Sequence, residues 1–285
     1  MDNISIIEVF ISGRRIGRMA LTPEGMCGFE YDADWIQTGF SISPFYLPLK
    51  SGLIMAKRDP FGGNFGVFDD SLPDGWGNLL LDRYLQERGI DPYKLNILER
   101  LSLIGSTGRG ALEYYPDKSV VTDAEYLNFD SLAKEVAKIL ESKESKGSVD
   151  LLYKYGGSSG GARPKIFTKV DGREWLVKFK ATNDPVDVGE IEYNYSLLAR
   201  DCGIRMAETR LFDNRYFGVE RFDRAPQGKI HTVSAAGLLH ANYRIPSLDY
   251  SILLKLTLNL TKDMEQVAEM FRLMVFNLSL IHISE

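Results

Sequence analysis

The segment that most limits how this chain can fold is a glycine loop followed by a hairpin and a helix. The loop reads GGSSGG over Gly156–Gly161. Strand-like segments follow at 165–170 and 174–180, and Asp171-Gly172 between them is a strong signal for a tight hairpin turn. A helical pattern then covers 187–202. This order predicts a loop that lies over an antiparallel pair of strands, with a helix beside them.

Such an arrangement suits a nucleotide. Glycine has no Cβ, so a glycine loop can approach a phosphate closely, and its backbone N–H groups can hold the anion. Alternation along the second strand places Lys178 on one face with Leu176 and Lys180, from which its ammonium could point beneath the loop. The following helix offers Glu190 and Glu192 as ion-pair partners that would hold this ammonium against phosphates.

Each feature also has an ordinary structural explanation. Gly161 is followed by Ala162 rather than by Lys, so the loop is not a Walker A motif, and it contains no GxGxxG. A glycine loop can be only a flexible turn, a lysine on a strand is commonly solvated, and a glutamate on a helix commonly faces water. The order of the features, at spacings of about 15 residues, is what resembles the nucleotide lobe of protein-kinase-like enzymes.

A strand that turns polar at its end follows downstream, in the string YFGVERFDR. In a kinase-like lobe this is the hinge, where backbone groups of Glu220 and Phe222 would face an adenine. The alternative is an ordinary strand end with ion pairs among Glu220, Arg221, Asp223 and Arg224. The spacing alone favours this alternative.

The first half of the chain is predicted to be a separate β-rich unit. Strand patterns occupy 4–11, 15–21 and 26–31. A glycine loop (GSTGRG) with a strand-like ALEYYP covers 105–116, and an amphipathic helix covers 128–142. The polar run ESKESKGSVD lacks apolar periodicity and is predicted to be a linker, with a domain boundary near 146. The chain then divides into an N-terminal subdomain (1–120), a helix and linker (121–147) and a second domain (148–285).

Composition excludes several classes of function. The net charge of -5 disfavours a protein that grips nucleic acid with its whole surface. Cys27 and Cys202 are isolated and the three histidines are scattered, so a zinc site lacks ligands, and the two lone cysteines fit a reducing cytoplasm. No apolar run reaches the roughly 18 residues that a membrane span needs.

Several strings together resemble the HipA family of toxin–antitoxin serine/threonine kinases. GGSSGGARPK, WLVKF and VERFDR carry the resemblance in the second half, and FGVFDDSLPDGWG and GRGALEYYP carry it in the first. The similarity extends over residues 4–277. It implies an α+β fold in which a small β-rich N-terminal subdomain precedes a protein-kinase-like nucleotide lobe, with only the start of a helical C-terminal lobe.

The resemblance also implies an activity and its partners. HipA-like proteins transfer the γ-phosphate of ATP, with Mg²⁺, to a serine or threonine of a target protein such as an aminoacyl-tRNA synthetase, which arrests growth. A small helix-turn-helix antitoxin is their partner and supplies the DNA contact. By position, Lys178 matches the family's phosphate-binding lysine. The other matching positions are Gly160, Gly161, Ala162 and Arg163 in the phosphate loop, Glu220 and Phe222 in the hinge, and Ser158 (or its neighbour Ser159) as the regulatory autophosphorylation site.

The end of the sequence departs from the family. Members continue from a Phe-Asn pair into N-x-D-x-H-x-x-N, which supplies the catalytic base and a metal-binding Asn, and a second metal-binding Asp follows later. Here Phe276-Asn277 is followed by LSLIHISE, without a further Asp or Asn, and His282 lacks the flanking residues of the family's histidine. We therefore expect a truncated or frame-shifted gene, with no catalytic residue and no metal ligand in this chain, no kinase activity and weak binding of ATP–Mg at best.

Such an ending leaves other functions open. A non-catalytic module that docks a helix-turn-helix antitoxin is the main alternative, and a small-molecule or lipid kinase is a weaker one. Loss of the remaining lobe is also expected to expose apolar side chains of the last two predicted helices. These are Ile252, Leu253, Leu256, Met270, Leu273 and Phe276.

Overall fold

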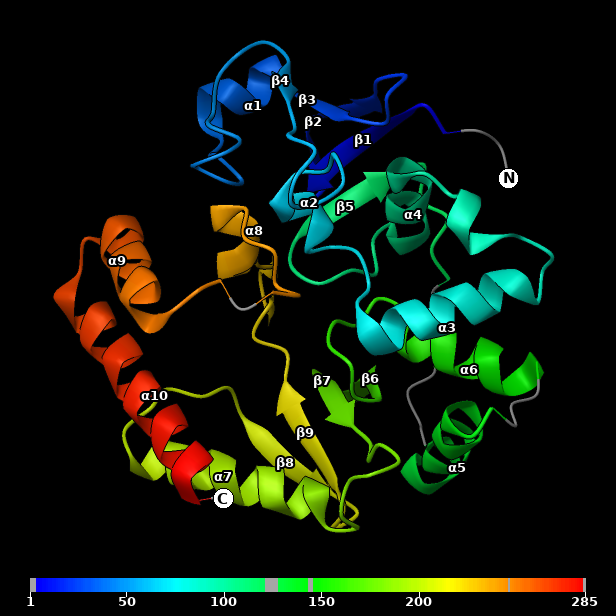
Figure 1. Ribbon diagram of the computed structural model, residues 1–285, viewed down its shortest axis with the longest axis vertical. Coiled ribbons are helices and arrows are strands. Elements are labelled where there is room, and N and C mark those ends of the chain that lie inside the picture. Colours follow the sequence, from blue (N-terminus) through cyan, green and yellow to red (C-terminus); the bar gives the residue numbers. More distant parts are fainter. Residues whose placement is uncertain (1–3, 121–127, 143–145, 246, 284–285) are drawn as a thin grey trace.

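A computed structural model describes residues 4–120, 128–142, 146–245 and 247–283 of the chain. Two antiparallel sheets form the centres of two packed units, and a pair of long helices lies along one side of the second unit (Figure 1). This mixture of helices with separate antiparallel sheets confirms the α+β prediction. None of the helices in the described residues is both long and apolar enough to cross a membrane.

The first sheet has the strand order β4-β3-β2-β1-β5. Its strands are β1 (Ile6–Ile11), β2 (Arg14–Leu21), β3 (Cys27–Tyr31), β4 (Ile54–Met55) and β5 (Leu112–Tyr115). In β1, Ile7, Val9 and Ile11 are buried while Ile6 is exposed, as the period of two requires. The predicted strands of the first half are therefore confirmed.

Short helices cover this sheet and connect it to the second unit. They are α1 (Ala33–Thr38), α2 (Gly66–Asp69), a 3₁₀ turn at Pro92–Lys94 and α4 (Ile97–Ile104). A capping box begins α4, because the Asn96 side chain accepts from the Glu99 N–H and the Glu99 carboxylate accepts from the Asn96 N–H. Leu98 and Leu101 of α4 lie in the same buried core as Phe29 of the sheet.

The second sheet has the strand order β6-β7-β9-β8, with α7 (Val188–Asp201) packed on β8 and β9. Its strands are β6 (Lys165–Val170), β7 (Arg173–Lys178), β8 (Thr209–Phe212) and β9 (Tyr216–Glu220). Positive φ angles of 52° at Asp171 and 77° at Gly172 form the turn between β6 and β7. The predicted hairpin is confirmed, and its register pairs Lys165 with Lys178.

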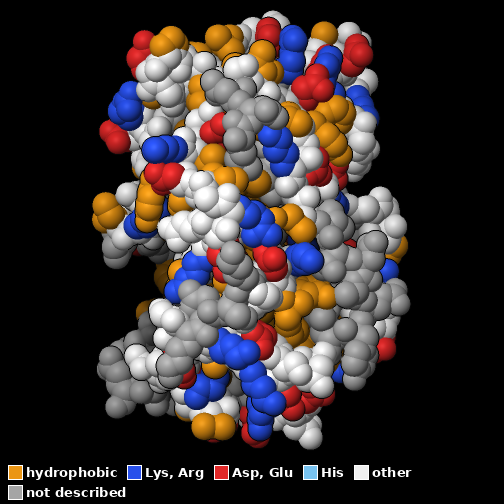
Figure 2. Space-filling view, turned by 90° about the vertical axis from the view of Figure 1, so that its right-hand side faces the viewer, with side chains coloured by type: hydrophobic (Ala, Val, Ile, Leu, Met, Phe, Trp, Pro, Cys, Tyr) orange, Lys and Arg blue, Asp and Glu red, His pale blue; other side chains and the backbone are white. Residues whose placement is uncertain are grey.

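Three further helices share the core of the second sheet. They are α3 (Gly75–Gln86), α5 (Phe129–Leu140) and α6 (Lys146–Gly156). Trp76 and Leu80 of α3 lie in one buried cluster with Val177 of β7, so α3 packs with the second unit although it precedes β5 in the chain. These helices help to form the face shown in Figure 2. On it, the basic, acidic and apolar side chains of the described residues are intermixed.

Helix α6 lies where the sequence predicted a linker. It begins at Lys146, and residues 143–145 of the polar run lie outside the described residues. The first turn of α6 is polar, so the sequence shows no apolar periodicity where the helix begins. Its apolar side chains Val149, Leu152 and Tyr153 come later, at helical spacing, and are buried in the second core.

The C-terminal part begins with a small hairpin and ends in two long helices. Its elements are β10 (Arg224–Ala225), β11 (Gly228–Lys229), α8 (Ala235–Leu239), α9 (Tyr250–Thr261) and α10 (Met264–Ile283). The prediction of which apolar side chains are exposed was wrong, because α9 and α10 pack on each other. Leu256 is buried and Ile252, Leu253, Met270, Leu273 and Phe276 are half-buried. The apolar side chains that are exposed are Leu258, Leu260, Met264, Phe271, Val275 and Leu278.

Candidate functional site

The glycine loop after α6 packs against the beginning of α3. The Asp74 N–H donates to the Ser159 carbonyl (3.3 Å), and the Trp76 N–H donates to the Gly161 carbonyl (3.0 Å). A Cβ on Gly77 would lie 2.4 Å from the Ser159 carbonyl oxygen, so this close approach needs a glycine. The DGWG segment and the glycine loop therefore fix one another's position, although the bonded residues are 85 positions apart in the sequence.

Lys165 lies beneath the loop and connects it to the sheet. Its Nζ donates to the Gly160 carbonyl at 2.6 Å, and the residue is only 8% exposed. Gly161 has a φ of 82°, and a Cβ there would lie 2.8 Å from this Nζ. Burial, followed by the nearby charges of Lys178 and Arg109, lowers the pKa of Lys165 to about 8. Lys165 was not among the predicted site residues, but the hairpin register, which places it opposite Lys178, could have identified it.

Lys178 and Glu192 form the predicted ion pair between strand and helix. Lys178 Nζ lies 3.0 Å from Glu192 Oε2, and both side chains are partly shielded from water. Close packing of α7 positions Glu192, because a Cβ on Gly189 would lie 1.9 Å from the Arg215 carbonyl oxygen. Glu190 is exposed in the first turn of α7, so Glu192 is the acid that pairs with Lys178.

The end of the loop continues the same charged group. Arg163 lies 2.9 Å from Asp184 and 3.8 Å from Glu192, between guanidinium nitrogens and carboxylate oxygens. Ala162 is exposed. Its backbone packs closely on Gly75, because a Cβ added to Gly75 would lie 2.6 Å from the Ala162 Cα. A cavity of about 600 Å³ opens beside Arg163 and Lys178, between α5 and the start of α7.

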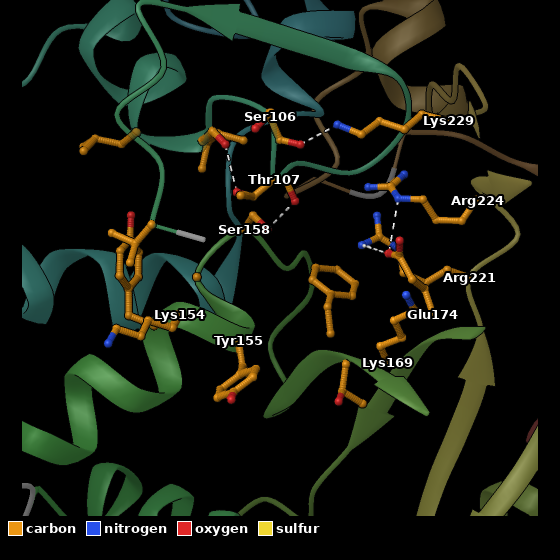
Figure 3. A pocket seen from close by; sticks show the side chains of 17 residues that line it. Ser106, Thr107, Lys154, Tyr155, Ser158, Lys169, Glu174, Arg221, Arg224 and Lys229 are labelled. Atoms are coloured by element: carbon orange, nitrogen blue, oxygen red, sulfur yellow. Dashed lines mark hydrogen bonds and ion pairs between the residues drawn. The ribbon is translucent and has the colours of Figure 1, made fainter. Parts of the chain in front are cut away.

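The two serines of the loop lie in different surroundings. Ser158 is 8% exposed, and its hydroxyl donates to the Thr107 carbonyl at 3.2 Å. It borders a second cavity of about 540 Å³, together with Ser106 and Thr107 (Figure 3). Ser159 is fully buried, and its hydroxyl has no hydrogen-bond partner among the described residues. Of the two, Ser158 is therefore the serine that borders a cavity.

The predicted hinge residues are engaged in the sheet or exposed. The Glu220 N–H donates to the Glu208 carbonyl at 2.8 Å, and its carboxylate lies 3.4 Å from Arg173. The Phe222 side chain is 70% exposed. Because strand pairing extends to Glu220, its N–H is not free to bind an adenine.

The RFDR string forms a buried network of charges. Asp223 Oδ2 lies 2.8 Å from Arg221 and 3.0 Å from Arg224. Glu174 contacts both arginines (Figure 3). Burial alone would raise the pKa of Asp223, but its bonds to Arg221 and to the Gly110 N–H lower it below its usual value. The predicted ion pairs are thus confirmed for three of the four residues, with Glu174 in the place of Glu220.

This network also binds the first unit to the second. The Gly110 N–H donates to Asp223 Oδ2 at 2.8 Å, and Arg224 donates to the Gly108 carbonyl at 2.9 Å. The same GSTGRG loop accepts from Ser158 through Thr107. Loop 105–110 of the first unit therefore contacts both the glycine loop and the end of β9. The sequence predicted the loop but not these partners.

The described residues contain no group of three or more His, Cys, Asp or Glu side chains that could hold a metal ion. This site supplies cations and a glycine loop, which suit phosphate groups, rather than a ready set of metal ligands. The described residues of this site therefore suit phosphate groups rather than a metal ion.

Comparisons with known proteins agree with this arrangement. The family described as HipA N-terminal domain matches residues 7–115, and the family described as HipA-like C-terminal domain matches residues 157–282. None of the curated proteins matches the chain significantly. A solved chain from the complex of the Shewanella oneidensis MR-1 toxin–antitoxin system HipA, HipB and its operator DNA is similar, at 20% identity and a TM-score of 0.63. The similarity covers 95% of this chain and 68% of that one, and at this identity it shows a common fold.

Proposed function

This chain belongs to the HipA family, and on that premise we propose that it carries the nucleotide-binding part of a toxin–antitoxin protein kinase. In this proposal the protein transfers a phosphoryl group from ATP to a serine or threonine of another protein and so arrests growth. Both matched families support it, because one match contains nearly all of the first sheet and the other contains the second sheet.

The ion pair between Lys178 and Glu192, beside the loop that Lys165 binds, is the observation that carries the proposal. ATP, when bound, would supply the γ-phosphoryl group. Lys178 would neutralise phosphate oxygens, and Glu192 would keep its ammonium in place. Backbone N–H groups at Gly160, Gly161 and Ala162, with the charge of Arg163, would bind the phosphates from above.

The adenine would lie toward the end of β9. The Glu220 N–H is bonded within the sheet, so we assign the hinge contact to backbone groups nearer Phe222. Mg²⁺ is expected to accompany ATP on the family resemblance alone.

The family's N-x-D-x-H-x-x-N string does not occur in these 285 residues. The groups that would deprotonate the substrate hydroxyl therefore do not come from this stretch of sequence. Nucleotide binding, rather than phosphoryl transfer, is the property that this chain can test. A role as a non-catalytic docking module remains the alternative function.

Partners and regulation are part of the same proposal. The related Shewanella chain was solved with HipB and operator DNA. We propose a helix-turn-helix antitoxin as the partner of this chain, with DNA contacted only through it, which agrees with a net charge of -5. The substrate would be a protein such as an aminoacyl-tRNA synthetase. Phosphorylation of Ser158 would add negative charge beside the nucleotide phosphates and weaken their binding.

Binding of ATP to the 285-residue chain and to Lys178→Ala, measured by calorimetry, tests the proposal. We expect weak binding by the wild type and a loss of at least about tenfold in the variant, because a charge-assisted bond to phosphate is removed. Lys50→Ala, an exposed lysine of the first unit, is the control and should bind as the wild type does. A wild-type chain that does not bind ATP would overturn the nucleotide function, and equal binding by Lys178→Ala would overturn the assignment of Lys178.

A further inference from the structure

Arg109 of the first unit reaches the glycine loop of the second. A Cβ on Gly160 would lie 2.4 Å from Arg109 Nη1 and 2.7 Å from its Cζ. A side chain at position 160 would therefore displace the guanidinium from this place. Arg109 comes from loop 105–110. In the same loop, Thr107 binds Ser158 and Gly110 binds Asp223.

Among the described residues, one hydrogen bond holds the guanidinium. Its Nη2 donates to the Asp70 carbonyl at 2.5 Å, at the end of α2. Its Nε is buried and has no hydrogen-bond partner among the described residues. An arginine presents five N–H donors in a rigid fork, so donors remain for an anion at the loop.

Three cations gather at this loop, and the charge of Arg109 also acts on the Asp70 carboxylate, whose pKa it lowers against the larger effect of burial. Arg109 and Lys178 both contribute to lowering the pKa of the buried Lys165 ammonium, which places the three cations within electrostatic range of one another. The acids that act on Lys165 in the opposite direction are Asp74 and Glu192, and Glu192 is already paired with Lys178. Repulsion among three cations at one loop is relieved when an anion binds between them.

We propose that Arg109 is a phosphate-binding residue of the nucleotide site, contributed by the N-terminal unit. This inference rests on the proposed function and extends it, because the nucleotide site then includes a residue from outside the kinase-like unit. Guanidinium groups suit phosphate oxygens through paired N–H donors, and the Asp70 contact orients the group before the nucleotide arrives. The first unit would then complete the site rather than only dock a partner.

The test compares Arg109→Gln and Arg109→Lys with the wild type in binding ATP and adenosine, by calorimetry. Arg18→Gln is the matched control, since it removes the same charge from an exposed position on β2. We expect ATP to bind about tenfold more weakly to Arg109→Gln, with partial recovery in Arg109→Lys. Adenosine, which lacks phosphates, should bind both variants and the wild type equally.

Each other outcome decides against the inference in a recognisable way. If Arg109→Gln binds ATP as the wild type does while Lys178→Ala does not, Arg109 has no phosphate role and the nucleotide site stands. If ATP and adenosine weaken together, Arg109 only supports the fold of the loop. If the wild type binds neither ATP nor tripolyphosphate, the nucleotide site fails, and the role of Arg109 fails with it.

Discussion

The ion pairs of Arg15 at the first sheet lie at the surface, whereas several charged residues at the second sheet are buried. Arg15 of β2 contacts Glu8 and Asp32 through side chains that are 22–42% exposed. At the second sheet Lys165, Arg221 and Asp223 are each less than 10% exposed. Burying a charge is costly even when it is paired, and apolar side chains would serve stability at least as well. The second sheet is therefore built around a requirement other than stability, which agrees with a ligand site there.

Loop 105–110 is the part of the first unit that contacts these buried charges. It binds Asp223 at one end and approaches Gly160 through Arg109 in its middle. Because the cost of buried charge is concentrated where the two units meet, the first unit is more than a separate docking domain. Substitutions at matched positions in the two regions can break or sharpen this contrast.

The largest difference in the free energy of unfolding is expected between Asp223→Ala and Asp32→Ala. Loss of Asp223 leaves the buried Arg221 with only the more distant carboxylate of Glu174, at 3.5 Å, and removes the acceptor of the Gly110 N–H. We expect the free energy of unfolding to fall by about 3–5 kcal/mol. Asp32→Ala should leave the unfolding midpoint nearly unchanged, because its pair is at the surface. Urea unfolding measures both, and similar losses in the two variants would remove the contrast.

Lys165 provides a pH test of the same idea. Its pKa is lowered to about 8 in the folded protein by burial and by neighbouring cations, and it returns toward 10.5 on unfolding. Between these values the unfolded chain binds more protons, so the free energy of unfolding should rise with pH, by at most about 1.4 kcal/mol per pH unit. Below pH 8 both states are protonated and the contribution of Lys165 is constant and unfavourable.

The comparison is between the wild type and Lys165→Met, each unfolded in urea at several values from pH 7 to 10. We expect the wild type to gain stability relative to the variant as the pH rises. Other groups titrate in both proteins and cancel in the difference. A pH-independent difference would mean that Lys165 is not held in a charged, unfavourable state beneath the loop.

Much of the fold was predictable from local patterns. Alternation in β1 and the Asp171-Gly172 turn depend on residues close in sequence, and both predictions were confirmed. The pairing of Lys178 with an acid on the next helix followed from strand alternation and helix position. Lys165 could have been added to the site by counting back from the turn.

Other features depend on tertiary packing and left no local signal. Arg109 and Gly160 are brought together by two segments that are 51 residues apart, and nothing in GSTGRG distinguishes a residue at a ligand site from an exposed one. Glu174 rather than Glu220 joins the RFDR network because β7 and β9 are neighbours in a sheet whose side-chain directions the string alone does not give. Helix α6 was hidden by its polar first turn.

The smallest effect separates two buried serines that receive the same substitution. Ser102, on α4 of the first unit, donates to the Pro116 carbonyl at 2.5 Å, and Ser102→Ala should lower the free energy of unfolding by about 1 kcal/mol. The buried Ser159 hydroxyl has no partner among the described residues, so Ser159→Ala should raise it by about the same amount. If the two substitutions change the free energy of unfolding in opposite directions, measured in urea, the glycine loop retains a polar group that lowers stability. A loss in both variants would mean that Ser159 finds a partner in solution, and the loop would then be an ordinary satisfied turn.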